Sequence, residues 1–106
     1  MPTATVVLVY HDKVEEHVVD ASPMSAYPHE LLGGTPTFVG AWGNVSMLAR
    51  AEPPEHTPIL CSNKIPPGAE AQIPSPALLT RLNDEYTPVD FTIDDYNTLL
   101  QKEVSN

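Results

Sequence analysis

The chain is poor in basic residues and in cysteine. Five Lys and Arg stand against 14 Asp and Glu among 106 residues, which gives a formal net charge of -9. Because nucleic-acid phosphates and anionic membrane surfaces are bound through clustered Lys and Arg, we expect no direct contact with nucleic acid or membrane. The single cysteine, Cys61, has no partner for an intramolecular disulfide and excludes a metal site of the paired CxxC kind. The sequence therefore indicates a reducing compartment and predicts neither a metal nor a cofactor.

Long hydrophobic runs are also lacking. The apolar run from Val6 to Val9 is far too short for a signal-peptide core or a membrane span, and no basic leader precedes it. We therefore expect a cytosolic protein, located in the host cytosol if the protein is viral. With 42% hydrophobic and 18% charged residues, residues 1–106 have the size and composition of a single domain with its own core.

Two hairpins and a later strand follow from the hydrophobic pattern. From Thr3 to Tyr10 nearly every residue is β-branched or apolar, which predicts a central strand buried on both faces. Val14 to Asp20 mixes valines with charges and predicts a partner strand with one wet face. Gly43-Asn44 splits two further apolar runs and predicts a two-residue hairpin turn with Gly at the first central position. The segment ALLTRLN, residues 77–83, predicts one more strand.

Proline and glycine mark a short helix and a long loop. Pro28 suits the first turn of a helix of one or two turns, and Gly33 or Gly34 suits the left-handed conformation that ends one. Residues 51–76 hold seven of the twelve prolines, and each proline removes a backbone donor and fixes φ. We therefore expect a loop there, with a brief edge strand in PILC, residues 58–61.

The segment from Phe91 to Glu103 predicts a well-defined C-terminal helix. Thr92 stands at the N-cap, Asp95 at the third helical position of a capping box, and Phe91 and Tyr96 at the hydrophobic-staple positions. An apolar stripe with spacings of three and four needs a sheet to cover it; its members are Ile93, Tyr96, Leu99, Leu100 and Val104. The predicted fold is thus α+β: a mostly antiparallel sheet of about five strands, with the C-terminal helix packed on one face and a short helix before residue 35.

No catalytic or metal-binding constellation stands out. The potential ligands lack the spacings that close a zinc site; they are His11, His17, His29, His56 and Cys61. We expect His11 in a turn and His17 on a wet strand face. No elbow motif surrounds Cys61, so it is interpreted as a small apolar residue of a half-buried strand rather than a nucleophile. The paired carboxylates are sequence neighbours that predict a solvated acidic face: Glu15-Glu16, Asp84-Glu85 and Asp94-Asp95.

Phe38 and Trp42 share one face if the segment between them is extended, with Gly40 between them. Such a gap admits either a ligand or a neighbouring element, and the C-terminal helix is the favoured occupant because exposed aromatic surface is unfavourable on a small domain.

Several segments taken in order resemble an uncharacterised small domain family of bacteriophages and large algal viruses. They are VVLVYHDKVEEHVV, LLGG, ILCSNKIPP, ALLTRLND and PVDFTIDDYNTLL. The features shared with that family are Gly33, Gly34, Asn63 and Thr92. The chain departs from it through the prolines at 66, 67, 74 and 76, where relatives carry a simpler loop and a glycine before the strand. Since the family has no established activity, the resemblance implies a viral or algal accessory protein and assigns no catalytic residue.

The leading functional hypothesis is a non-enzymatic interaction module that binds a protein partner, and a basic one if its acidic surface makes the contact. The proline-rich loop is the other candidate contact surface. One alternative is a DNA-mimicking inhibitor of a nucleic-acid enzyme, and another is an enzyme or small-ligand binder with a pocket lined by Trp42, Cys61 and Asn63. The oligomeric state stays open, because an edge strand at Pro58–Cys61 could pair with a second chain or be blocked by its flanking prolines.

Overall fold

The computed structural model describes residues 3–22, 26–60, 64–66 and 72–101 of the chain. Within these ranges the elements are β1 (Thr3–Val9), β2 (Val14–Asp20), α1 (Tyr27–Leu32), β3 (Pro36–Trp42), β4 (Val45–Arg50), β5 (Ala77–Leu82), β6 (Pro88–Val89) and α2 (Ile93–Gln101). The fold is α+β, with a mostly antiparallel sheet, a short helix before residue 35 and a C-terminal helix, as predicted.

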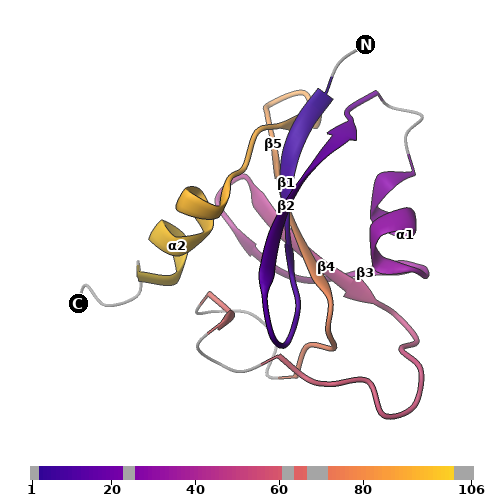
Figure 1. The fold of residues 1–106 in the computed structure, drawn as a ribbon. Helices are drawn as coiled ribbons and strands as arrows, with labels where there is room; N and C mark the ends of the chain where they lie inside the picture. The colour runs from indigo at the N-terminus through magenta and orange to yellow at the C-terminus, as the bar shows by residue number, and fades with distance from the viewer. Residues whose placement is uncertain (1–2, 23–25, 61–63, 67–71, 102–106) are drawn as a thin grey trace.

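The sheet places a late strand at its centre. The strand order is β2-β1-β5-β4-β3, and every neighbouring pair is antiparallel. Both predicted hairpins are present, β1 with β2 and β3 with β4, and β5 lies between them (Figure 1). The two hairpins are therefore joined into one sheet by a strand that follows both of them in the sequence.

The short strand β6 fills the place where β1 and β5 separate. β1 pairs with β5 only through Val7–Val9, while Arg81 at the other end of β5 pairs with Val89. Thr5 of β1 instead donates its N–H to Asp90 Oδ1 at 2.9 Å and accepts the Phe91 N–H at 2.8 Å. These bonds fix where α2 leaves the sheet. A two-residue strand is too short to leave a hydrophobic pattern, and the sequence did not predict it.

The two helices cover opposite faces of the sheet (Figure 1). On β1, Val7 and Val9 belong to the core that includes Tyr96 of α2. Val6 and Leu8 belong to a second core on the α1 side. The prediction that this strand is buried on both faces is confirmed.

The helix α1 begins and ends as its proline and glycine predict. Pro28 lies in the first turn, and Gly33 takes the left-handed conformation at φ 75° while its N–H bonds to His29 O at 2.9 Å. The hydroxyl of Tyr27 lies 3.0 Å from Thr80 Oγ1, and both residues are buried. This polar contact joins α1 to the central strand.

The start of α2 follows the predicted capping box. Thr92 and Asp95 exchange hydrogen bonds, and the staple residues Phe91 and Tyr96 are both buried. The Ile93 N–H donates a hydrogen bond to Glu16 Oε2 at 2.7 Å, which links the start of α2 to the edge strand β2.

The apolar stripe of α2 faces the sheet. Tyr96 and Leu99 are buried, and Ile93 and Leu100 pack against the same core. The fifth predicted member of the stripe, Val104, lies outside the described residues.

The prediction that Phe38 and Trp42 share a face is wrong. Phe38 pairs with Leu48, but Gly40 pairs with Met47, so Val39 is an extra residue that forms a β-bulge. A bulge shifts the alternation of side chains by one position. Trp42 therefore packs against the α2-side core, whereas Phe38 faces the other side and is 57% exposed.

The prediction of an edge strand at residues 58–61 is also wrong for residues 58–60, which are the ones that the structure describes. Ile59 makes only an isolated bridge to Pro74, and Leu60 N donates to Ile73 O at 2.9 Å. The segment pairs within the loop and not with the sheet, because prolines interrupt the row of donors that a ladder needs. Leu60 and Ile73 are nevertheless buried in the α2-side core, so this loop covers part of the sheet.

Candidate functional site

Two turns meet at one end of the sheet. The β3–β4 turn consists of Gly43 and Asn44, with Gly43 at φ 61° in the first central position as predicted. The β5–β6 turn spans residues 83–87, and the N–H of Leu82 just before it bonds to Asn44 O at 2.9 Å. Asn44 and Leu82, which are distant in sequence, are thus held side by side at this end of the sheet.

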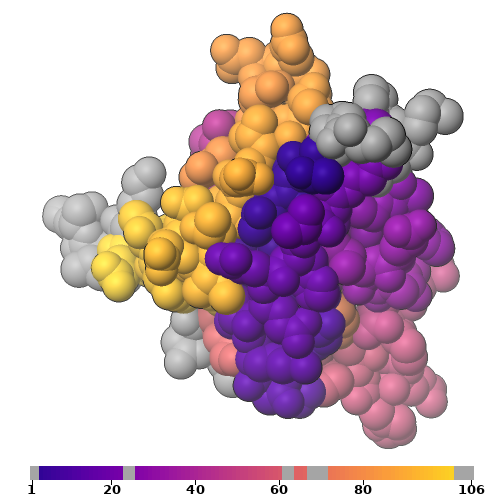
Figure 2. All heavy atoms as spheres, turned by 45° about the horizontal axis from the view of Figure 1, so that its top comes forward, coloured from indigo at the N-terminus to yellow at the C-terminus, as the bar shows by residue number. Residues whose placement is uncertain are grey.

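The β5–β6 turn is organised by Asn83. Its Oδ1 accepts the N–H of Glu85 at 2.8 Å and of Thr87 at 3.0 Å, and its carbonyl accepts the N–H of Tyr86 at 2.9 Å. Tyr86 adopts a left-handed φ of 60°, and its side chain is 83% exposed. The orange segment that contains this turn projects from the molecule at the top of Figure 2.

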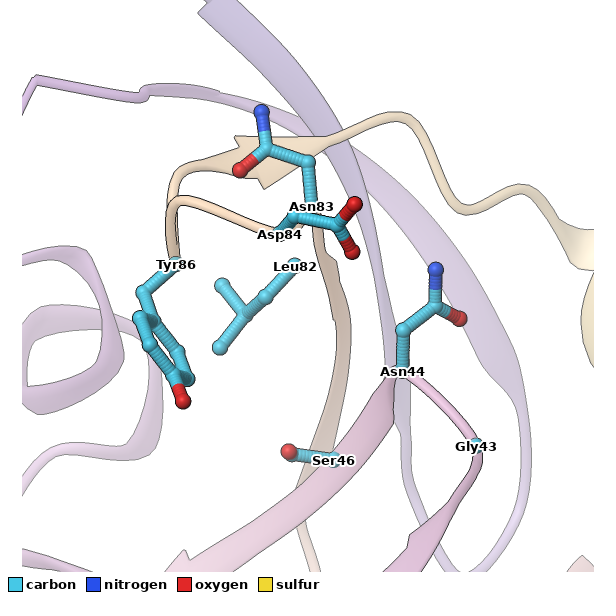
Figure 3. Close-up of a pocket in the computed structure, with 7 residues that line it drawn as sticks. All are labelled: Gly43, Asn44, Ser46, Leu82, Asn83, Asp84 and Tyr86. Atoms are coloured by element: carbon cyan, nitrogen blue, oxygen red, sulfur yellow. The ribbon is translucent and has the colours of Figure 1, made fainter.

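A hollow of about 290 Å³, which we call the Tyr86 hollow, lies between the two turns. It is lined chiefly by Asn44, Ser46, Leu82, Asn83, Asp84 and Tyr86. In Figure 3 the Tyr86 ring and the Asn44 side chain flank it from opposite sides, with Leu82 and Ser46 between them. Ser46 pairs with Thr80, whose hydroxyl meets α1, so the hollow opens on the α1 face.

A second hollow of about 230 Å³, the Trp42 hollow, lies behind the same turn on the α2 face. Trp42 of β3 pairs with Val45 of β4, and Val45 pairs with Arg81 of β5. The small Val45 side chain therefore lies between the larger side chains of Trp42 and Arg81. Neighbouring strands are about 4.8 Å apart, which leaves roughly 10 Å between the backbones that carry Trp42 and Arg81. Thr98 and Leu99 of α2 line the hollow as well. The prediction that the C-terminal helix packs at the gap between Phe38 and Trp42 therefore holds for Trp42 only, because Phe38 faces the other side of the sheet.

Arg81 is the cation of the Trp42 hollow. Its guanidinium carbon lies 5.3 Å from the centre of the Phe91 ring, and its Nη1 lies 3.7 Å from Asp95 Oδ2. The same carboxylate caps α2, so the charge on Arg81 is partly neutralised by a group that stabilises the helix.

A third hollow of about 300 Å³ includes Arg50, Ile59 and Pro74 among the residues that line it. Arg50 donates through Nη2 to Ser75 O at 2.9 Å, while its buried Nε has no hydrogen-bond partner among the described residues. Its lining combines this one cation with proline and aliphatic surface from the long loop.

The chain matches a family model described as a family of unknown function, DUF5880, over residues 6–99. The chain belongs to this family. No curated protein and no solved structure matches it. The resemblance noted from the sequence is thus supported as far as an uncharacterised small domain is concerned.

Of the three residues predicted to line a pocket, the structure describes only Trp42 in this DUF5880 domain. Trp42 lines the hollow described above. Cys61 and Asn63 lie outside the described residues, so a pocket formed by all three stays a prediction. Sequence reasoning missed Tyr86 and Asn83, although an Asn at the start of NDEYT is a recognisable turn signal.

Some of the acidic side chains of the domain have structural roles. Glu15 accepts hydrogen bonds from Lys13 and His17, which lower the pKa of its carboxyl, and the same contact raises the pKa of Lys13. Backbone N–H groups are capped by the carboxylates of Glu16, Asp20, Asp90 and Asp95. These five of the 14 acidic side chains therefore serve turns, the edge strand β2 and the start of α2.

Two of the histidines, His11 and His17, lie in the elements that the sequence predicts for them. His11 lies in the β1–β2 turn and His17 on β2, beside Glu15 at 3.0 Å. In the described part of the chain, no group of three or more His, Cys, Asp and Glu residues is arranged to hold a metal ion. Nor does any described helix have the length and apolar character needed to cross a membrane.

Proposed function

We propose that this domain is a non-enzymatic interaction module that binds a basic protein partner at the end of the sheet where the β3–β4 and β5–β6 turns meet. The observation that carries the proposal is Tyr86. Its side chain is 83% exposed on a turn that Asn83 closes with two side-chain hydrogen bonds.

Tyrosine is an unfavourable residue for this position in the isolated domain. A left-handed φ costs a non-glycine residue about 1–2 kcal/mol, and Gly or Asn fits such a turn better. The exposed ring gains little from burial, and the described residues make no hydrogen bond to its hydroxyl. Exposed aromatic side chains on a well-ordered turn are the type that contributes most to protein interfaces. Contact with a partner would supply the missing stabilisation.

The charge of the chain supports a basic partner. A net charge of -9 repels acidic surfaces and attracts basic ones over roughly 10 Å at moderate salt. A DNA mimic would need a row of free carboxylates spaced like phosphates. Here Glu16, Asp90 and Asp95 are instead engaged with backbone N–H groups, so we favour a protein-binding role over inhibition by DNA mimicry.

On the resemblance to the domain family of phages and large algal viruses, we further propose that the module is a viral accessory protein acting in the host cytosol. A gene that lies among phage or algal-virus genes would support this part of the proposal. A gene surrounded by cellular housekeeping genes would count against it.

The test is capture from host lysate by the immobilised full chain, with Tyr86→Ala as the key variant. Val18→Ala is the matched control, because Val18 is also exposed, at 73%, but lies on the edge strand β2. We expect one basic protein to be captured at low salt by the native chain and by Val18→Ala, and to be lost with Tyr86→Ala.

Two further measurements make the test specific. Raising the salt concentration should release the partner, because screening weakens attraction between exposed charges. A photo-crosslinking phenylalanine analogue at position 86 should join to the same partner, and one at position 18 should not. Capture that survives both Tyr86→Ala and high salt would contradict the proposal.

A further inference from the structure

We infer that the Tyr86 hollow receives an arginine side chain of the partner. The inference rests on the proposed function and identifies the chemistry of its anchor. It follows from the size of the hollow, from the charge of its lining, and from the polar groups there that are free to bond.

The size of the hollow suits one side chain. Its volume is about 290 Å³, just below the range of roughly 300–1,000 Å³ that is typical of small-molecule pockets. The aliphatic side chain of Leu82 lies between its flanks (Figure 3). An arginine stem of three methylene groups can lie over that apolar surface while its charged end reaches the polar rim.

The charge of the lining favours a cation. Asp84 is the acidic residue among the described residues that line the hollow, and none of these is Lys, Arg or His. In the Trp42 hollow the corresponding carboxylate, Asp95, already faces Arg81 at 3.7 Å. Asp84 has no such ion pair within the described residues, so a cation from outside would meet an uncompensated charge.

The polar groups of the rim are free to bond a guanidinium. The described residues give no hydrogen bond to the side chains of Asn44, Ser46, Asp84 or Tyr86, in contrast with the engaged carboxylates of β2 and α2. The amide and carboxylate oxygens can accept from the five N–H donors of arginine. The Tyr86 ring offers a face for stacking a planar cation, a geometry that arginine fulfils better than lysine.

The Asn83 amide supports the turn and leaves one group for the partner. Its Oδ1 is engaged with Glu85 and Thr87, which leaves its NH₂ group available as a donor. A backbone carbonyl of the partner is a suitable acceptor for it. The hollow thus combines acceptors for a cationic side chain with a donor for the chain that carries it.

The experiment is an NMR titration of the full chain with N-acetyl-arginine amide. The side-chain amide signals of Asn44 and Asn83 and the backbone signals of residues 83–86 should shift. The neutral isostere N-acetyl-citrulline amide should leave them in place. The lysine analogue should bind more weakly, because an ammonium does not stack as a plane.

Charge-removing variants give the matched control. Asp84→Asn should weaken binding of the arginine probe by up to about fivefold, the effect of one exposed ion pair. Asp12→Asn makes the same change of charge in the β1–β2 turn at the opposite end of the sheet and should leave the affinity unchanged (Figure 1). Both residues are exposed, so both variants should fold.

Several outcomes would overturn the inference. Equal shifts with the arginine and citrulline probes would show that the hollow does not distinguish a charged side chain from a neutral one. Shifts caused by N-acetylglucosamine and not by arginine would make the hollow a sugar site. If the arginine titration fails while Tyr86→Ala still abolishes capture, the proposed function stands with a different anchor. If arginine binds as expected but Tyr86→Ala leaves capture intact, the hollow binds cations and the proposed partner site is wrong.

Discussion

Thr92 and Asp95 bond to each other in both directions at the start of α2. The Asp95 N–H donates to Thr92 Oγ1 at 3.2 Å, and the Thr92 N–H donates to Asp95 Oδ2 at 3.1 Å. We expect Thr92→Ala to lower the free energy of unfolding by about 1 kcal/mol, the usual effect of losing an N-cap side chain. Denaturant unfolding followed by circular dichroism measures this difference.

The neighbouring Asn97 supplies the control for this prediction. It is exposed on the same helix, and its side chain makes no hydrogen bond to the described residues. Asn97→Ala should therefore change stability by no more than about 0.5 kcal/mol. Equal losses in the two variants would show that the cap does not stabilise α2.

A second prediction concerns the contact that joins α1 to the sheet. Tyr27→Phe leaves the buried Thr80 hydroxyl without its partner, and Thr80→Val does the same to the Tyr27 hydroxyl. Each single variant should lose about 1–3 kcal/mol, because a buried polar group is left unsatisfied. The double variant should lose less than the sum of the two, since no unpaired hydroxyl remains.

A double-mutant cycle at neutral pH measures that coupling. Strict additivity would mean that the two hydroxyls do not interact in the folded state. It would also leave α1 held to β5 by apolar contacts alone.

Alkaline pH should destabilise the domain through Tyr96. Its hydroxyl donates to Lys64 O, and burial raises its pKa to about 12 from an ordinary value of 10.0. Burial also raises the pKa of Tyr27. Since an unfolded tyrosine ionises first, the stability that neutral Tyr96 contributes is complete below pH 10 and is lost as the pH rises through about 12.

Unfolding measured from pH 8 to pH 12 tests this. Between pH 10 and pH 12, ionisation of Tyr96 should lower the free energy of unfolding by about 1.4 kcal/mol per pH unit. Tyr96→Phe should be less stable than the native chain at pH 8, having lost the bond to Lys64, and the difference should shrink above pH 10. A difference that stays constant would show that Tyr96 ionises equally in both states.

The features that the sequence predicted correctly are those determined by residues close to one another in the chain. The capping of α2, the Gly33 terminus of α1 and the Gly43-Asn44 turn are each specified by residues within one or two turns of chain. Their physics is local, so the sequence predicted them correctly. The burial of β1 on both faces was predicted for the same reason, because its apolar residues occupy both parities.

The missed features depend on pairing between distant segments. Nothing local to Ala77–Leu82 says that it lies between β1 and β4, and the bulge at Val39 appears only when the register against β4 is known. That register brings Asn44 beside Leu82 and thereby forms the Tyr86 hollow. The sequence predicted the Gly43-Asn44 turn but neither the β5–β6 turn nor the site between the two.

Gly43 stands between the two hollows, and its conformation gives a last prediction. At φ 61° it occupies the region that L side chains avoid, although an added Cβ would meet no atom within 4 Å. Gly43→Ala should therefore lose about 1–2 kcal/mol through backbone strain alone. Gly34→Ala is the control, because the new methyl would only touch the flexible Arg50 side chain at 3.4 Å. Thermal unfolding should show a lower Tm for Gly43→Ala and a nearly unchanged Tm for Gly34→Ala; the reverse order would mean that steric contact and not backbone conformation decides which glycine the fold requires.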